Sequence, residues 1–205
     1  MEKFNGGIYD ACNFMTSGKQ IKNILDLGAR HGEGYELFGK NHPTAKYFMV
    51  EPSPRCFPFI KEVMKKYEKI TEFQLIEGVL GDKDCDLNFF QLENDDDQSG
   101  NLFSDRNKNY GEASIITTKM HNFNKFFNHL DFVKCNIEGG EYDLIDTGFF
   151  DIVDSFVMEA HNFHVMNKNY KNIIESLIDK FDLKIWGDTS YKYCFINGKK
   201  RLKNL

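Results

Sequence analysis

The 205-residue chain carries 26 Lys and Arg against 31 Asp and Glu, which gives a net charge of −5. This acidic balance argues against a general binder of nucleic acids or anionic membranes, because both attract a strongly basic surface. The 20 Phe and 9 Tyr supply apolar surface for a substantial core, so we expect one globular domain over residues 1–205.

The N-terminal segment and the cysteines indicate a cytoplasmic protein. The first residues, MEKFNGGIYDACNF, lack a basic stretch followed by an apolar one, and no apolar run approaches the roughly 18 residues that span a bilayer. The five cysteines are dispersed and form no C-x-x-C pair, which is typical of reduced thiols.

Strand and helix patterns alternate along the chain. Residues 1–20 are expected to form a helical or irregular cover. Apolar runs predict strands at 23–27, 46–51, 73–79, 131–137, 155–160, 181–187 and 191–196, and apolar spacing predicts helices at 33–41, 55–69, 139–147 and 167–180. A further short strand is expected at 87–92, and the acidic stretch 93–97 is expected to be a loop.

This alternation predicts an α/β fold with a mostly parallel, seven-stranded sheet. The runs FVKCNI and SFVMEA are almost continuously apolar, as parallel strands buried on both faces are. Gly187 to Ser190 separate the last two runs, which should therefore form an antiparallel hairpin at the sheet edge. Such a doubly wound, Rossmann-like domain binds ligands beyond the carboxyl ends of its strands.

A glycine turn follows the first strand, and an acid ends the second. The turn reads D-L-G-A-R-H-G from Asp26 to Gly32, and Glu51 can accept hydrogen bonds from two ribose hydroxyls. Glu33 opens the next helix, where it would oppose a pyrophosphate but suit a cation. The pattern therefore favours S-adenosylmethionine, which carries a sulfonium and an amino group, over a dinucleotide.

The fourth and fifth strands end in polar residues spaced two apart. Asn136 and Glu138 follow one apolar run, and Glu159 and His161 end the other. Residues two apart on a strand share one face, so these side chains should project into the crevice at the strand ends.

These segments together resemble the FkbM-type S-adenosylmethionine-dependent methyltransferases. That family carries a D-x-G-A-N-x-G turn, an E-P pair, a D-F-x-K-x-D-x-E-G-x-E segment and an E-x-H motif. Here they read Asp26 to Gly32, Glu51-Pro52, Asp131 to Glu141 and Glu159-Ala160-His161. Two residues depart from the pattern: Arg30 replaces the usual Asn in the turn, and Asn136 replaces the usual Asp.

The resemblance implies a single-domain class I methyltransferase, with a cofactor and catalytic core over 22–161 and a C-terminal helix and hairpin over 162–205. Family members mostly methylate hydroxyls, often on sugars, so the expected acceptor is a sugar or glycan, for example a deoxysugar such as rhamnose. The residues expected to hold S-adenosylmethionine are Asp26, Gly28, Ala29, Gly32, Glu51, Gly78, Val79 and Leu80.

His161 is the expected general base, because a neutral imidazole with a pKa near 6.5 can accept the proton of a sugar hydroxyl. Glu159 would orient it, and Glu138 would bind the acceptor or the methionine amino group. A structural histidine bonded to Glu159 is the alternative. Asn136, Glu138 and His161 also form a candidate Mg²⁺ or Mn²⁺ site, which the loss of the Asp disfavours. His42, His121 and His129 are expected to be structural.

Other function classes stay open at this stage. One is a cofactor-binding module that has lost catalysis, in which Asn136 would be the sign of that loss. Another is ribose 2′-O-methylation of RNA, against which the acidic balance counts. A short-chain dehydrogenase is disfavoured, because none of the nine tyrosines has Lys four residues later.

Overall fold

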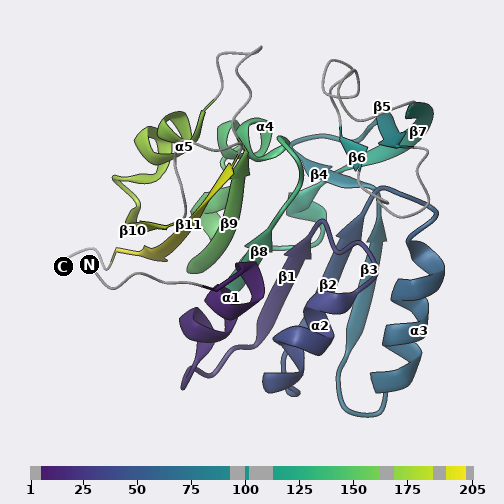
Figure 1. Ribbon diagram of the computed structural model, residues 1–205, viewed down its shortest axis with the longest axis horizontal. Coiled ribbons are helices and arrows are strands. Elements are labelled where there is room, and N and C mark those ends of the chain that lie inside the picture. Colours follow the sequence, from purple (N-terminus) through teal and green to yellow (C-terminus); the bar gives the residue numbers. More distant parts are fainter. Residues whose placement is uncertain (1–5, 93–99, 102–112, 162–168, 187–192, 202–205) are drawn as a thin grey trace.

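A seven-stranded sheet forms the centre of the molecule, in the order β10-β11-β9-β8-β1-β2-β3 (Figure 1). The structure is a computed structural model and describes residues 6–92, 100–101, 113–161, 169–186 and 193–201. The strands of this sheet are β1 (Asn23–Leu27), β2 (Lys46–Glu51), β3 (Phe73–Glu77), β8 (Phe132–Cys135), β9 (Ser155–His161), β10 (Phe181–Trp186) and β11 (Tyr193–Lys200).

The strand directions confirm the predicted fold. The five strands β3, β2, β1, β8 and β9 are parallel to one another. β11 lies antiparallel between β9 and β10, so the C-terminal hairpin closes one edge of the sheet. The chain leaves β1 toward β2 on one side and returns to β8 on the other. A doubly wound sheet offers its ligand crevice at this reversal, beyond the strand ends.

Helices cover both faces because successive strand residues point to opposite sides. Ile24 faces the helices α1 (Ile8–Thr16), α2 (Glu33–Leu37) and α3 (Phe57–Tyr67), together with the 3-10 turn η1 (Gly39–Asn41). Leu25 and Leu27 face the opposite layer, which contains α4 (Glu141–Asp146), α5 (Tyr170–Leu177) and the 3-10 turns η3 (Phe123–Lys125) and η4 (Phe149–Ile152).

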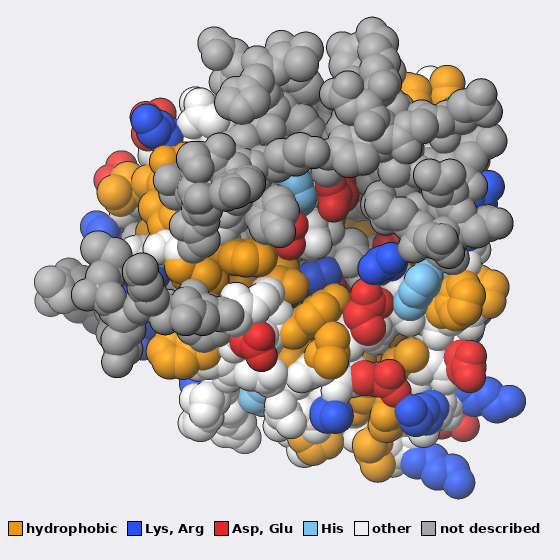
Figure 2. All heavy atoms as spheres, viewed as in Figure 1, with side chains coloured by type: hydrophobic (Ala, Val, Ile, Leu, Met, Phe, Trp, Pro, Cys, Tyr) orange, Lys and Arg blue, Asp and Glu red, His pale blue; other side chains and the backbone are white. Residues whose placement is uncertain are grey.

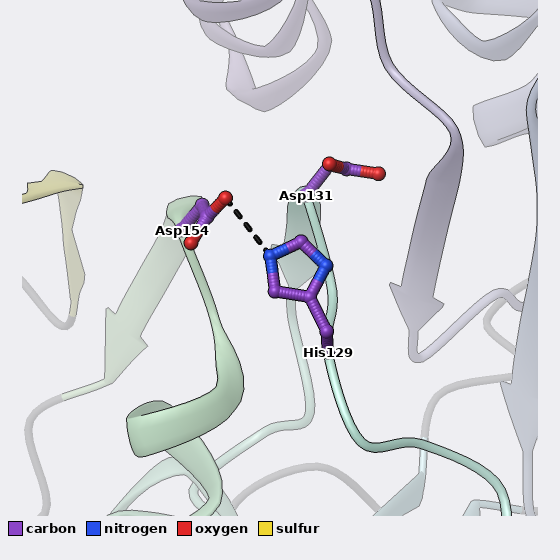
Figure 3. A group of neighbouring side chains, drawn as sticks. All are labelled: His129, Asp131 and Asp154. Atoms are coloured by element: carbon purple, nitrogen blue, oxygen red, sulfur yellow. Dashed lines mark hydrogen bonds and ion pairs between the residues drawn. The ribbon is translucent and has the colours of Figure 1, made fainter.

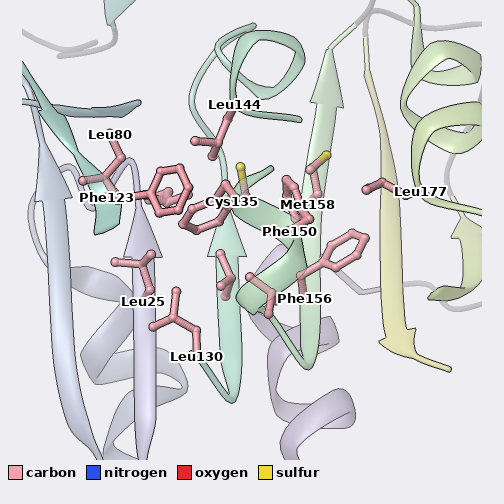
Figure 4. Packing of buried hydrophobic residues seen from close by; sticks show 14 of the residues in the cluster. Leu25, Leu80, Phe123, Leu130, Cys135, Leu144, Phe150, Phe156, Met158 and Leu177 are labelled. Atoms are coloured by element: carbon pink, nitrogen blue, oxygen red, sulfur yellow. The ribbon is translucent and has the colours of Figure 1, made fainter. Parts of the chain in front are cut away.

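The larger core lies between the sheet and the layer of α4 and α5 (Figure 4). Phe156 of β9 lies edge-on to Phe150 and Phe181, with ring centroids 5.1 Å away in each case. All three side chains are buried. Edge-to-face pairs add about 0.5–1.5 kcal/mol each to the burial of the rings. This packing holds β9 in place beside β8. Asn136 and Glu138 follow the carboxyl end of β8, and Glu159 and His161 lie at that of β9.

The structure corrects the predicted strand 73–79. Gly78 has φ 143°, and a side chain there would collide with the carbonyl oxygen of Lys119. The chain therefore turns at this glycine, and β4 (Val79–Gly81) joins a second sheet in the order β4-β7-β5-β6. The other strands of that sheet are β5 (Cys85–Leu92), β6 (Gly100–Asn101) and β7 (Ala113–Asn122). The sequence predicted part of β5 and missed β7.

Several predicted helices are shorter in the structure. The helix expected at 139–147 begins only at Glu141, because Glu138 and Gly139 have φ 54° and 103°, outside the helical region. The helix expected at 33–41 ends at Leu37 and continues as η1. The hairpin turn 187–190 and the loop 93–97 lie outside the described residues. Among the described helices, none is both long and apolar enough to cross a membrane.

Candidate functional site

A cavity of about 480 Å³ lies at the carboxyl ends of β1, β2 and β8. Gly28, Glu51 and Asn136, which follow or end these three strands, form one side of it. The second sheet and α4 close the other side, with Leu80, Phe89, Met120, Ile137 and Leu144 as apolar lining residues. The cavity thus occupies the crevice that the topology predicts.

The glycine turn after β1 is held tightly against both neighbouring strands. The N–H groups of Gly28 and Ala29 both donate to the carbonyl of Val50, at 3.0 and 3.1 Å. On the other side, the Asn136 N–H donates to the carbonyl of Leu27 at 3.0 Å. Gly28 has φ 72°, and a side chain there would overlap the Asn136 carbonyl oxygen. Only glycine fits, so the turn brings bare backbone to the cavity wall.

The other predicted turn residues shape the turn from behind and do not line the cavity. Ala29 is buried, and Gly32 begins α2 in a left-handed conformation, with φ 82°. Asp26 is fully buried; one carboxylate oxygen lies 2.9 Å from the ammonium of Lys134, and the other accepts the hydroxyl of Tyr47 at 3.1 Å. Asp26 therefore acts on the turn and not directly on a ligand in this cavity.

Glu51 ends β2 with its carboxylate on the cavity wall. One oxygen accepts the N–H of Arg30 at 2.8 Å, and the other accepts the N–H of Ser53 at 2.9 Å. Each oxygen keeps lone-pair capacity for a second donor. Burial raises the pKa of Glu51 to about 7, although the two N–H donors act to lower it. A ligand with two adjacent hydroxyls would satisfy both oxygens.

Gly78, Val79 and Leu80 line the cavity, as the sequence placed them, next to Glu51. The Gly78 N–H is already used, since it donates to the Glu51 carbonyl at 2.9 Å. The Val79 and Leu80 side chains and the lining residues of the second sheet make this part of the cavity apolar.

The four predicted catalytic residues lie together where β8 and β9 end, and two of them reach the cavity. Asn136 and Glu138 line it, whereas Glu159 and His161 stand behind them. The Asn136 amide donates to Glu159 at 3.3 Å, and Nε2 of His161 lies 3.3 Å from Glu138 and 3.5 Å from Glu159. His161 is only 4% exposed.

His161 differs from the expected neutral base in its charge. Its Nδ1 lies 3.1 Å from the fully buried carboxylate of Glu141, so acids face both ring nitrogens. Burial acts to lower the pKa of His161, but the hydrogen bonds with Glu141 and Glu159 and the charges of Glu141 and Glu138 outweigh it and raise the pKa to about 10. The ring is therefore an imidazolium near neutral pH. A metal ion held by Asn136, Glu138 and His161 would have to displace the proton from the ring, because a ligating imidazole nitrogen is neutral.

A second group of possible metal ligands lies at the other end of the strands, where β8 and β9 begin (Figure 3). It consists of His129, Asp131 and Asp154. His129 Nε2 forms an exposed ion pair with Asp154 at 3.0 Å. Asp131 accepts the backbone N–H groups of Lys22 and Asn23 at 3.0 and 2.8 Å. These contacts tie the amino ends of β1, β8 and β9 together, far from the cavity at the carboxyl ends.

Two important residues were missed as site residues from the sequence. Lys134 lies within an apolar strand, and a charge in such a run signals a buried partner. That signal was available in FVKCNI. Glu141 was noticed only as part of a motif, because nothing in the sequence shows that its side chain turns back toward His161.

The charges along the cavity favour a cationic ligand. Five acids line it against two basic residues; the acids are Glu51, Asp82, Glu138, Asp143 and Asp146, and the bases are Arg30 and Lys83. An excess of carboxylates opposes a pyrophosphate and suits a sulfonium and an ammonium group. These carboxylates, the two acceptor oxygens of Glu51 and the apolar part of the cavity beside them together fit S-adenosylmethionine.

Comparisons with known proteins agree with this geometry. In structure, the chain is similar to the precorrin-6y C5,15-methyltransferase of Geobacter metallireducens (TM-score 0.55, 14% identity, covering 94% of this chain and 88% of that one). It is also similar to an S-adenosylmethionine-dependent O-methyltransferase of Thermotoga maritima (0.57, 9%, 100% and 69%). A third similar structure is Aeropyrum pernix fibrillarin with natively bound S-adenosyl-L-methionine (0.52, 13%, 96% and 80%). At these identities the likeness establishes the fold alone.

Sequence comparison identifies the family. No curated protein matches the chain with significant sequence similarity. The family model described as the methyltransferase FkbM domain matches residues 26–185, which include the glycine turn, Glu51 and the polar ends of β8 and β9. The chain therefore belongs to the FkbM family of S-adenosylmethionine-dependent methyltransferases.

Proposed function

We propose that the protein transfers the methyl group of S-adenosylmethionine to a hydroxyl group of a sugar or glycan. The supporting observation is the cluster of Glu138, Glu159 and His161, which meets the cavity at the ends of β8 and β9. S-adenosylmethionine supplies a strongly electrophilic methyl group. An attacking hydroxyl then needs a nearby group that takes its proton as the new bond forms.

Glu138 is the proposed proton acceptor. It is the carboxylate of the cluster that lines the cavity, and 22% of its side chain is exposed there. His161 does not line the cavity, and its ring is already protonated. His161 instead holds the Glu138 carboxylate in place from behind, 3.3 Å away. This assignment replaces the neutral-imidazole mechanism with a carboxylate one.

Asn136 is proposed to orient the acceptor. Its amide nitrogen donates to Glu159, and its carbonyl oxygen is buried without a hydrogen-bond partner among the described residues. That oxygen can accept a hydroxyl next to the one bound by Glu138. Two neighbouring acceptors suit a vicinal diol, which is the common feature of sugars. Fixing the attacking oxygen in this way is a large source of rate.

The charge of the surface supports a small or uncharged acceptor over RNA. On the face seen in Figure 2, the Lys and Arg side chains of the described residues are interspersed with acidic ones and form no continuous basic stripe. The acidic lining of the cavity would also repel a phosphate backbone.

The test is an acceptor screen with the purified protein, S-adenosylmethionine and a panel of sugar glycosides that includes deoxysugars. Formation of S-adenosylhomocysteine and a one-methyl mass gain in the acceptor would support the proposal. Glu138→Gln should lower kcat by about 10²-fold or more. Glu62→Gln, on the exposed surface of α3, is the matched control.

Three results would contradict the proposal. A wild-type protein that binds S-adenosylhomocysteine but methylates no glycoside would favour the module without turnover. Methylation of RNA in the same assay would move the acceptor to another class. An unchanged kcat in Glu138→Gln would remove the assigned proton acceptor.

A further inference from the structure

Lys134 is a buried lysine in the middle of the parallel sheet. It is the third residue of β8, and only 2% of its side chain is exposed. Its ammonium lies 2.9 Å from the Asp26 carboxylate and donates to the carbonyl of Gly28 at 2.7 Å. A longer contact, 3.4 Å, reaches the carbonyl of Leu27. Lys134 does not line the cavity, so any effect on a ligand must pass through the residues it touches.

Stability alone is a poor reason for this buried pair. Moving an ammonium and a carboxylate out of water is costly, and well-packed apolar residues in the place of a buried ion pair are often equally or more stable. The neighbours of Lys134 in β8, Val133 and Cys135, are apolar and fully buried. What an apolar residue could not supply is a directed donor to the Gly28 carbonyl.

That carbonyl belongs to the peptide that forms the cavity wall. The N–H of Gly28 is fixed by Val50 of β2, and its C=O is fixed by Lys134 of β8. The Ala29 N–H of the same peptide donates to the Val50 carbonyl, so this peptide is held from β2 at its N–H and from β8 at its C=O. Asp26 also holds the ammonium and is itself held by Tyr47. Lys134 thus connects the turn after β1 to the strand that carries Asn136 and Glu138.

We propose that Lys134 is a positioning residue of the cofactor turn, which fixes the Gly28 carbonyl and thereby the backbone against which S-adenosylmethionine binds. This role rests on the cofactor site and is independent of the chemistry of the acceptor. The charge state suits it: burial acts to lower the pKa of Lys134, but the charge of Asp26 outweighs this effect and raises the pKa above its usual value.

The test compares two variants that share one background. Lys134→Met alone would leave Asp26 buried without its ion-pair partner and destabilise the fold. Asp26→Asn, which keeps the Lys134 donor to Gly28 but leaves the ammonium without its ion-pair partner, serves as the background. Asp26→Asn/Lys134→Met differs from it by the loss of that unpaired ammonium and of its donor to Gly28. The binding of S-adenosylhomocysteine is measured by calorimetry, well below the melting temperature of each variant. The double variant should bind at least tenfold more weakly than Asp26→Asn alone.

Two further measurements separate positioning from simple destabilisation. The amide NMR resonances of Gly28 and Ala29 should shift between the two variants even without ligand, because the loss of the donor releases their shared peptide. Lys61→Met is the matched control: Lys61 forms an exposed ion pair with Glu77 at 2.9 Å, so its removal should leave the affinity unchanged.

Equal affinities in the two Asp26→Asn variants would overturn the proposal. Failure of the double variant to fold would also overturn it, since Lys134 would then serve the core and not the turn. Neither result bears on the acceptor. A wild type that binds S-adenosylhomocysteine but methylates no glycoside would contradict the proposed function and leave the role of Lys134 intact.

Discussion

Replacing Glu51 with Gln should weaken the binding of S-adenosylhomocysteine about a hundredfold. The Glu51 carboxylate already accepts the backbone N–H groups of Arg30 and Ser53, and its remaining lone pairs are available to two ribose hydroxyls. A hydrogen bond to a charged group contributes about 1.5–3 kcal/mol. The Gln amide nitrogen can accept neither an N–H nor a hydroxyl. One ribose bond is lost and the other becomes neutral, a loss of about 3 kcal/mol, or two decades in affinity.

The affinity should also depend on pH through the same residue. Burial raises the pKa of Glu51 from its usual 4.5 to about 7 in the free protein. The ionised form accepts both hydroxyls, so affinity should fall by up to about tenfold per pH unit below 7. The stability of the fold depends on pH through Glu51 in the opposite direction to the affinity. This carboxyl favours the folded state below about pH 4.5, and that contribution, about 3 kcal/mol, is lost as the pH rises to about 7.

Calorimetry with S-adenosylhomocysteine, from about pH 6 to about pH 8, tests both parts. Wild type should bind more tightly as the pH rises, and Glu51→Gln should bind weakly at every pH. Glu62→Gln, an exposed change of the same type on α3, should behave as wild type. A Glu51→Gln affinity within about threefold of wild type, with the same pH dependence, would show that Glu51 does not hold the ribose.

Three other substitutions or conditions test separate parts of the site. Gly28→Ala should abolish S-adenosylhomocysteine binding and lower the melting temperature, because the added methyl overlaps a backbone carbonyl; Gly7→Ala, where nothing lies within 4 Å, is the control. The raised pKa of His161 should stabilise the fold below about pH 6.5, and this contribution should disappear as the pH rises through about 10. In denaturant melts over that pH range, wild type should therefore lose more stability than His161→Gln. Asn136→Asp should destabilise the protein by about 1–3 kcal/mol in urea melts at neutral pH, because it sets a carboxylate against Glu159.

The sequence predicted the main sheet because its signals are local. The apolar runs of β8 and β9 are nearly unbroken, and Gly28 and Glu51 occur where a βαβ unit needs them. The second sheet was harder to predict. Ile115, Thr117 and Lys119 of β7 are exposed and alternate with more buried neighbours, so the strand carries a weak period-two pattern within a polar stretch. The break at Gly78 depends on a contact with Lys119, 41 residues later, which no local pattern contains.

The candidate site shows the same division between local and distant information. The ends of β1, β2 and β8 were predictable, since parallel strands must end at one edge, and Gly28, Glu51, Asn136 and Glu138 all line the cavity. The charge of His161 was not predictable. It depends on Glu141, which lies 20 residues earlier and contacts the ring across the turn that precedes α4.

The departure of Asn136 from the family pattern follows from this charge balance. Glu138, Glu141 and Glu159 already surround the single positive charge of His161. An Asp at position 136 would add a fourth carboxylate, which needs either a bound cation or a proton to be stable. Asn supplies a donor to Glu159 instead and leaves a neutral acceptor on the cavity wall. The substitution thus avoids a repulsion and keeps a hydrogen-bonding group beside Glu159.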